Sequence, residues 1–499
     1  MDPARIPVII GVGQINDRTD DPFAAMDPIA LMIAALHAAD RDGGGGWLAA
    51  IDSLSIVDQI SFRDLNPVAG AVAAGLGITP AHLFQTAKPM GDSPVRLLNE
   101  AANRIGAGES MVAAVIGAEA LRTAARRAAA TGGDVDHNAM RIRHRGAAPI
   151  YRQLYGLTAP VDVYPLYENA TRCAWGQTLD EAQAESGLLW SQFSHVAADN
   201  PNAWLRSPKS VAEIVTPSPA NRRIAFPYPK LMVANSAVNQ GAGFIVTSLA
   251  QARARGVPAD RIIYIGHGAA AHEDEDVLAR DSYSASAGMR VSLEQTLAAN
   301  ALRIDQIDLV ELYSCFPCVP KMARRIIGWP VDKPASVVGG LTFGGGPIGN
   351  YMSHAVAAMV DRLRAGDGQN GLLFGNGGFA TYNHSIILSR APIPGVAFPH
   401  DIDCQAAADA LRGPRPLVDA DYAGPGVIES YTVFYDRTGA PSAGVVVARN
   451  PAGSRFLARV PAVDMAGIAL LSGDRLDPIG SAGTGTRAAD GLLDWHASD

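Results

Sequence analysis

Short apolar runs recur along the first 390 residues, separated by segments whose apolar residues follow helical spacing. Val8–Gly13 is a β-branched run that ends in glycine, and Pro28–Ala39 has its apolar residues three and four positions apart. Met111–Gly117 is continuously apolar, which is typical of a strand buried on both faces. The alternation returns at Arg261–Gly266. Strands that alternate with helices of about ten to fifteen residues predict a largely parallel, layered α/β fold, and two such passes indicate a duplicated architecture.

Two parts of the chain depart from this alternation. From about 121 to 223 the periodicity weakens, which predicts an insertion laid over the scaffold. Prolines cluster after Arg390, and the runs that follow, such as Val427–Asp436, alternate like antiparallel strands joined by glycine-containing turns. We therefore expect an N-terminal half at 1–255 that carries the insertion, a C-terminal half at 256–392, and a small β-domain at 393–499 with a flexible tail.

The composition excludes several classes of function. The chain has 499 residues, 48% hydrophobic and 18% charged, and a net charge of -8. This acidic balance argues against nucleic acid as a partner, because phosphate binding needs concentrated Lys and Arg. No apolar run approaches the roughly eighteen residues of a membrane span. The N-terminus lacks a secretion pattern, so a cytoplasmic location is expected.

The cysteines point to neither disulfides nor a metal. Four cysteines are too few for a disulfide framework in a chain of this length. Cys315 and Cys318 form a C-x-x-C pair, but no second pair of cysteines or histidines accompanies it. A zinc site needs about four such ligands, so no metal is expected.

Three turn-forming segments follow one another in the C-terminal half: Leu312–Pro317, Gly339–Asn350 and Gly375–Phe379. Their order and spacing resemble the active-site loops of thiolases, which carry NEAF or HDCF, GHP and CxG motifs. The resemblance is to sterol-carrier-type thiolases and to bacterial thiolase-like proteins, often labelled acetyl-CoA acetyltransferase, that have an additional C-terminal domain. It implies a duplicated five-layer thiolase fold with an inserted loop domain, followed by a small OB-like β-barrel, and a role in lipid metabolism.

The resemblance also shows which reactive side chains are missing. In thiolases the nucleophilic cysteine precedes a helix that ends at a Gly-Glu pair, here Gly108-Glu109, and this places Gly91 at the nucleophile position. Met90 and Asp92, its neighbours, offer no thiolate either. Loss of a nucleophile costs on the order of 10^6 in turnover. Gly346 replaces the histidine of GHP, and Leu373 stands where the cysteine of CxG is expected, so a standard two-cysteine mechanism is not predicted.

The first loop keeps groups that can transfer protons. Tyr313-Ser314-Cys315-Phe316 resembles HDCF, with the cysteine retained and tyrosine at the histidine position. Thiolase-like aldolases of steroid side-chain degradation resemble this arrangement and use tyrosine for retro-aldol cleavage of an acyl-CoA. Tyrosine suits that work if its pKa falls from about 10 toward neutrality. The alternatives are that Cys315 is an apolar filler and Tyr313 a core aromatic.

The ligand implied by the resemblance is coenzyme A or an acyl-CoA, with no covalently bound cofactor. Guanidinium groups suit phosphate oxygens, so Arg141 and Arg143 in the insertion are candidates for the CoA phosphates. His354 and His384 are alternatives for the missing histidine. The residues expected to line the pantetheine arm and the thioester are Ser93, Asn239, Gly345, Pro347, Asn376 and Gly377.

Three functions fit these residues. The first is a CoA-thioester enzyme, a lyase or acyltransferase, that uses Tyr313 and Cys315 for C–C bond chemistry. The second is an acetyl-CoA C-acyltransferase with Cys315 as its nucleophile. The third is a non-catalytic CoA-binding protein. The resemblance also implies a homodimer through the central sheets, unless the added domain covers that surface.

Overall fold

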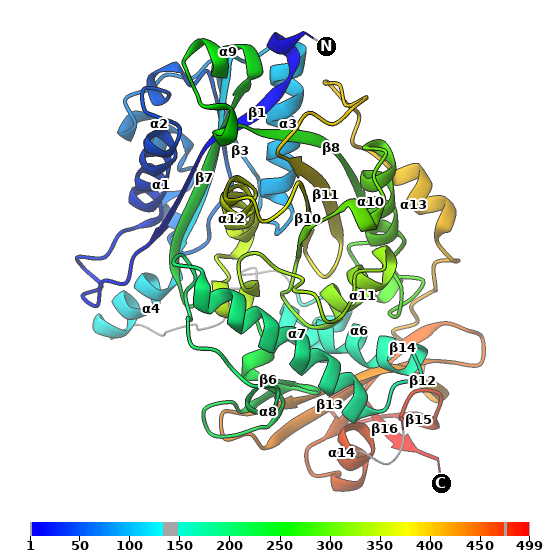
Figure 1. Cartoon of the computed structure of the whole chain (residues 1–499). Coiled ribbons are helices and arrows are strands. Elements are labelled where there is room, and N and C mark those ends of the chain that lie inside the picture. Colours follow the sequence, from blue (N-terminus) through cyan, green and yellow to red (C-terminus); the bar gives the residue numbers. More distant parts are fainter. Residues whose placement is uncertain (1, 133–147, 474–476, 499) are drawn as a thin grey trace.

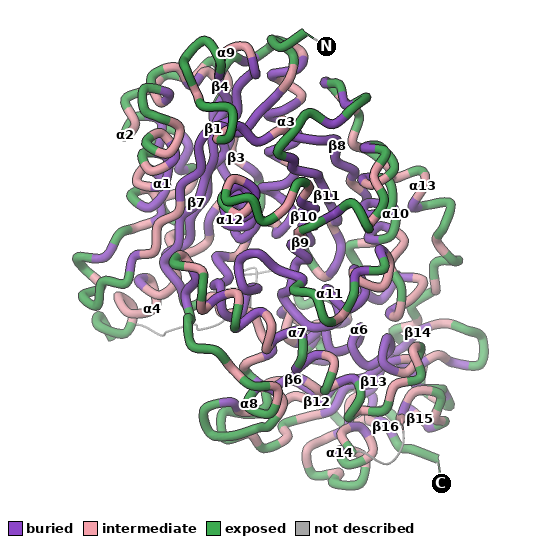
Figure 2. Tube along the Cα trace, in the orientation of Figure 1, coloured by how far each residue is buried: buried purple, intermediate pink, exposed green. Residues whose placement is uncertain are grey.

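A computed structural model describes residues 2–132, 148–473 and 477–498. Its centre is a nine-stranded sheet in the order β3-β2-β4-β7-β1-β8-β11-β10-β9 (Figure 1). Burial is concentrated along these strands (Figure 2). The strands are β1 Pro7–Asn16, β2 Ser53–Ile56, β3 His82–Gln85, β4 Val112–Ala120, β7 Asn239–Ser248, β8 Ile263–His272, β9 Leu309–Leu312, β10 Asn370–Gly377 and β11 Tyr382–Ser389.

The sheet is duplicated, as expected, but it is not largely parallel. The pairs β2–β3, β2–β4 and β9–β10 at its two edges are parallel. The five central pairs are antiparallel. The order β1-β7-β4-β2 in the first half corresponds to β8-β11-β10-β9 in the second. The predicted direction was wrong for the central strands because apolar runs mark burial and do not specify the direction of a strand.

Helices cover both faces of the sheet. α1 (Pro28–Asp42) packs on β1 and β7, and α10 (Ala287–Ala299) packs on β8 and β11. α3 (Ser93–Ala107) and α12 (Tyr351–Ala365) contact each other and the sheet, and most of their residues are buried. Helices buried on most sides belong in a central layer. α3 is followed by the C-cap residue Gly108, whose φ of 72° suits glycine.

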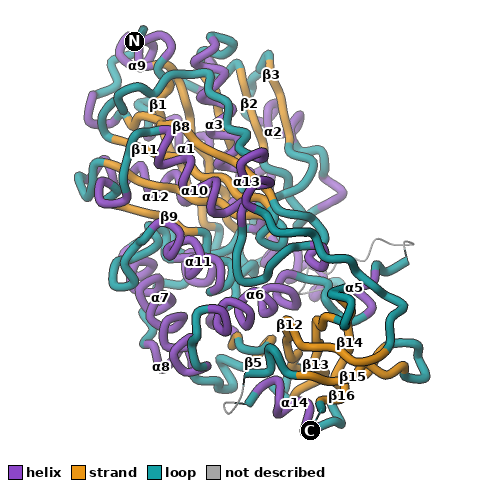
Figure 3. The backbone as a smooth tube through the Cα atoms, turned by 90° about the vertical axis from the view of Figure 1, so that its right-hand side faces the viewer, coloured by secondary structure: helices purple, strands orange, loops and turns teal. Residues whose placement is uncertain are grey.

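The insertion forms a helical layer below the sheet. α6 and α7 lie between the central sheet and the C-terminal strands (Figure 3). Its elements are α4 Leu121–Ala130, α5 Tyr151–Leu154, α6 Pro160–Ala174, α7 Leu179–Asp199, α8 Val211–Val215, β5 Arg223–Ala225 and β6 Tyr228–Pro229. α11 (Cys318–Ile327) follows the first loop and packs on α6, where Lys321 Nζ pairs with the buried Glu168 carboxylate.

The C-terminal part is the expected small barrel. Its five strands are paired in the order β13-β14-β16-β15-β12, and a further β12–β13 pairing closes the ring. The elements are β12 Gly424–Tyr435, β13 Pro441–Arg449, β14 Arg455–Pro461, α14 Met465–Ser472, β15 Ala482–Arg487 and β16 Leu493–Ala497. β5 from the insertion adds to β12, so the barrel sheet includes residues from outside the C-terminal part.

The tail, expected to be flexible, forms β15 and β16. The sequence is rich in small residues there, which is typical of a loop. In the structure Gly483 lies directly under the buried Trp495 ring, and a β-carbon at position 483 would overlap that ring. The small residues therefore allow close strand packing.

No described helix is long and apolar enough to cross a membrane.

Candidate active site

The three loops meet at the start of α3, around Gly91. A β-carbon at position 91 would overlap the Tyr313 hydroxyl oxygen and the Asn376 carbonyl oxygen. The space that a cysteine side chain would need is therefore occupied by the first and third loops. Gly91 is required here by the close approach of these groups.

Tyr313 directly follows β9, and its backbone N–H donates to the Phe374 carbonyl of β10 (3.1 Å). Its ring packs edge-to-face on Tyr351, with 5.8 Å between the ring centroids. Burial, together with the nearby Cys315 and Asp92, raises the pKa of Tyr313 well above 10. The lowered pKa that would suit Tyr313 for proton transfer near neutral pH is therefore not found. Tyr313 is a neutral phenol that can donate a proton.

Cys315 is buried beside Tyr164 of α6. Burial raises the pKa of its thiol to about 12, although a hydrogen bond with Tyr164 opposes the shift. The thiolate is the nucleophilic form of cysteine. A thiol with this pKa is protonated at neutral pH, which argues against Cys315 as a nucleophile.

Asp92 is the acidic group at the site that sequence reasoning dismissed. It precedes the first residue of α3, and its Oδ1 has no hydrogen-bond partner among the described residues. Burial raises its pKa to about 6, against smaller opposing effects of its own backbone N–H and Arg96. A carboxyl group that ionises near neutral pH suits a general base. In the sequence, Asp92 stands just before Ser93-Pro94 at the start of a helix, and this position indicates only a helix cap.

The third loop approaches Asp92 through its glycines. A β-carbon on Gly377 would lie 2.7 Å from Asp92 Oδ1, and one on Gly375 would lie 3.0 Å from Asp92 Cα. Leu373, the position expected to reach this point, is buried further back in β10, where it pairs with Glu311 of β9. The strand position beside α3 is therefore Gly375.

Asn376 presents only its backbone carbonyl to Gly91. Its side-chain Nδ2 donates to Asn383 Oδ1 (2.9 Å), and its Oδ1 lies 3.3 Å from the Tyr164 hydroxyl. The side chain is therefore engaged within the β10–β11 turn and with α6.

The second loop has no imidazole. The Gly346 N–H donates to the Asn235 carbonyl (2.8 Å). Gly345 has a φ of 103°, and a β-carbon there would overlap the Gln240 amide. Pro347 follows in the turn that leads to α12. The loop conformation therefore depends on glycine, and no side chain of this loop replaces the oxyanion donor.

The two alternative histidines face elsewhere. His354 Nδ1 lies 2.8 Å from Gln14 Oε1 of β1, and His384 lies beside Gly268 of β8. Burial lowers the pKa of each to about 3, so both imidazoles are neutral.

The remaining predicted ligand residues are mostly structural. Ser93 is the buried first residue of α3. Asn239 is buried, and its side-chain amide binds the backbone: Oδ1 accepts from the Thr123 N–H (3.0 Å) and Nδ2 donates to the Asp17 carbonyl (3.2 Å). Arg141 and Arg143 lie outside the described residues.

α6 contacts the β10–β11 turn of the site through Tyr164. The Tyr164 hydroxyl accepts from the Ala380 N–H (2.8 Å) and donates to the Gly378 carbonyl (3.2 Å). Its ring stacks on Phe316, with centroids 4.5 Å apart. Asp92 is 8% exposed and Tyr313 6% exposed. Both groups are therefore largely shielded from solvent.

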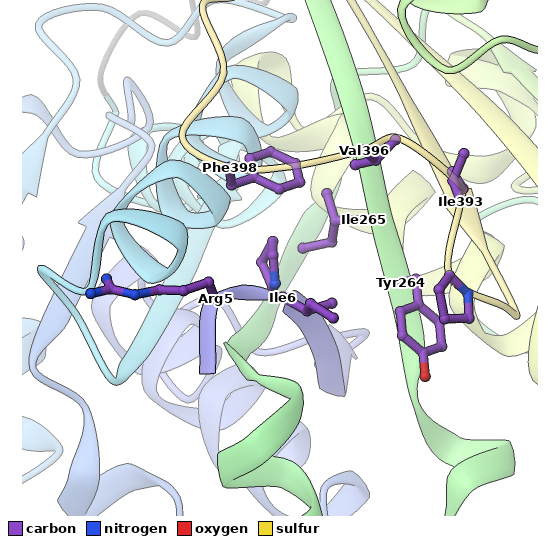
Figure 4. Close-up of a pocket in the computed structure, with 9 residues that line it drawn as sticks. Arg5, Ile6, Tyr264, Ile265, Ile393, Val396 and Phe398 are labelled. Carbon is purple, nitrogen blue, oxygen red and sulfur yellow. The ribbon is translucent and has the colours of Figure 1, made fainter. Parts of the chain in front are cut away.

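Two cavities lie away from these groups. One, between the first residues of the chain and Phe398, has a volume of about 20 Å³, enough for roughly one water (Figure 4). The second has a volume of about 400 Å³ and is lined by residues that include Asp58, Arg63 and Lys88. It ends at Pro89, two residues before Gly91.

The fold and its three loops define a protein of the thiolase class. Human mitochondrial 3-ketoacyl-CoA thiolase in complex with CoA is 14% identical, covers 78% of this chain and 99% of its own, and has a TM-score of 0.58. The Ltp2-ChsH2(DUF35) aldolase is 18% identical, covers 77% of this chain and 97% of its own, and has a TM-score of 0.59. These likenesses show the thiolase fold.

A further relative shows the family. The monomeric SCP2-thiolase-like protein type 1 of Mycobacterium smegmatis is 30% identical over 100% of both chains, with a TM-score of 0.83. The model of the additional C-terminal domain of type 1 thiolase-like proteins matches residues 404–484. The chain belongs to the SCP2-thiolase-like proteins of type 1, which confirms the predicted resemblance. No curated protein matches it.

Proposed function

We propose that this protein binds a CoA thioester at the start of α3 and cleaves a C–C bond of its acyl group without a covalent acyl-enzyme. The observation that carries the proposal is the placement of Tyr313 and Asp92 around Gly91: a phenol fills the position of the missing nucleophile, beside a carboxyl group with an unpartnered oxygen. The thiolase fold and the likeness to an aldolase support the substrate class.

The two groups have complementary roles in a retro-aldol reaction. Asp92, as a carboxylate, removes the proton from a β-hydroxyl group of the acyl chain. The bond between Cα and Cβ breaks, which releases a carbonyl product and leaves the thioester enolate. Tyr313 donates its proton to Cα, and the proton held by Asp92 returns to the Tyr313 phenolate, so both groups are restored.

The test is cleavage of a β-hydroxyacyl-CoA by wild type and two variants. Tyr313→Phe and Asp92→Asn should each lower kcat by about 10^2 to 10^4, the usual contribution of one proton-transfer group. Because the pKa of Asp92 is raised to about 6, wild-type kcat should increase as the pH rises through 6 and level off above it. Equal rates for wild type and Tyr313→Phe would refute the proposal.

The closed site favours one alternative, a CoA-binding protein without catalysis. Asp92 and Tyr313 are nearly inaccessible to solvent, and the Tyr164 hydroxyl accepts a hydrogen bond from the backbone of the β10–β11 turn. Wild-type protein that binds CoA but cleaves no β-hydroxyacyl-CoA at any pH between 5 and 9 would support this alternative.

A further inference from the structure

Arginine side chains surround Trp204 beside the second loop. The guanidinium carbons of Arg18 and Arg122 lie 4.5 and 5.9 Å from the centroid of the Trp204 ring. Burial lowers the pKa of Arg18, and the charges of Arg122 and Arg206 lower it further. The three cations are therefore close enough to repel one another, in a chain whose net charge is -8.

Few acidic groups balance these cations. Asp20 accepts from both Arg122 (3.0 Å) and Arg126 (3.1 Å). Asp17 is buried, and its carboxylate accepts from the backbone N–H groups of Thr19 and Met26. Among the described residues, Arg18 and Arg206 form no ion pair within 4.0 Å, so their charge is available to an anion.

Backbone groups hold the arginines in place. Arg18 donates to the carbonyls of Ala203 (3.0 Å) and Trp204 (2.8 Å), and Arg206 donates to the carbonyl of Ala198 (3.0 Å). Asn239 joins the two segments that carry Arg18 and Arg122, because its amide binds the backbone of Asp17 and of Thr123. A site fixed in this way loses little side-chain entropy when a ligand binds.

The arginines adjoin the second loop of the candidate active site. The Trp204 N–H donates to the Gly344 carbonyl (3.0 Å). The segment 235–238 runs from the second loop to α4: Asn235 accepts from the Gly346 N–H, and Val238 accepts from the Arg122 N–H (3.2 Å). The loop after β1 and α4 lie side by side at the left edge of the molecule (Figure 1).

We propose that Arg18, Arg122 and Arg206 bind the phosphate groups at the nucleotide end of the CoA thioester. The inference rests on the proposed function, since it assigns the remote end of the same ligand. Guanidinium groups suit phosphate oxygens, and a local positive surface on an acidic protein concentrates an anionic ligand. Arg127 takes no part, because it donates to the Pro22 carbonyl and packs on Phe62.

The test is calorimetric titration with CoA, dephospho-CoA and pantetheine. Arg18→Gln and Arg206→Gln should each raise the Kd for CoA about tenfold, since a hydrogen bond to a charged group is lost. The Kd for pantetheine should not change. Arg290→Gln removes the same charge from α10, where Arg290 pairs with Glu294, and should leave the Kd for CoA unaltered.

Arg206 is exposed, so its variant tests the site even if Arg18→Gln impairs folding. Wild-type protein that binds pantetheine as tightly as CoA, or an Arg206→Gln variant with wild-type affinity for CoA, would overturn the inference. This outcome is distinct from failure of the proposed function. CoA binding that depends on these arginines, without cleavage of any β-hydroxyacyl-CoA, leaves the phosphate site standing and removes only the chemistry.

Discussion

At the scale of single residues, Gly91 shows how closely the loops fit. Gly91→Ala places a methyl group where the Tyr313 hydroxyl and the Asn376 carbonyl already lie. Overpacking of this kind costs about 1–3 kcal/mol, so the free energy of unfolding should fall by that amount in urea denaturation. Gly70→Ala is the matched control, since nothing lies within 4 Å of its added methyl group. Equal stability of Gly91→Ala and wild type would mean that Tyr313 swings aside.

Single residues of the candidate site also show which features the sequence could predict and which it could not. Gly91 and Tyr313 were found because motif spacing counts positions along the chain. The raised pKa of Asp92 could not be predicted, because it arises from burial, and the third loop that approaches Asp92 lies far away in sequence. The raised pKa of Tyr313 could not be predicted for the same reason, because burial is its largest cause.

At the scale of elements, Tyr164 joins α6 to the β10–β11 turn. Tyr164→Phe removes the hydroxyl that accepts from Ala380 and donates to Gly378. The amides of residues 378–382 should therefore exchange hydrogen faster, by about tenfold if the opening free energy falls by about 1.4 kcal/mol. Hydrogen exchange followed by mass spectrometry measures this directly.

Tyr167→Phe is the control on the same helix, because its hydroxyl makes a single bond, to the Phe379 carbonyl (2.8 Å). It should accelerate exchange less, since no backbone N–H loses its acceptor. Unchanged exchange in Tyr164→Phe would show that packing of its ring on Phe316, and not the hydroxyl, keeps the turn closed.

Secondary-structure elements were predicted correctly where a single local pattern of apolar residues determines them. Apolar runs located the strands of the central sheet except the edge strand β3, and the alternation after residue 427 located the barrel. Strand direction and the order of the tail depend on contacts between distant segments, such as Gly483 under Trp495. No local pattern encodes those contacts.

At the scale of the whole molecule, the barrel is joined to the rest of the chain through buried polar contacts. Arg455 of β14 is fully buried and binds Glu429 through two nitrogens, each 2.6 Å from a carboxylate oxygen. Its remaining nitrogen donates to the carbonyls of Leu278 and Arg280, which belong to the C-terminal half. Ser430 of β12 also donates to the Leu166 carbonyl of α6 (2.6 Å). We therefore expect the barrel and the thiolase core to unfold together.

Arg455→Met tests this coupling. It removes both Arg455 donors from the Glu429 carboxylate, which keeps only Arg449 (2.8 Å) among the described residues, and it leaves two backbone carbonyls without that donor. Breaking a buried pair costs about 3–5 kcal/mol. Calorimetry of wild type should show one transition, and the variant should show an earlier barrel transition separated from that of the core. Arg459→Met on the same strand removes more exposed pairs with Asp490 and Asp494, each worth about 1 kcal/mol or less, and should keep a single transition. Two transitions already present in wild type would mean that the barrel and the thiolase core unfold independently.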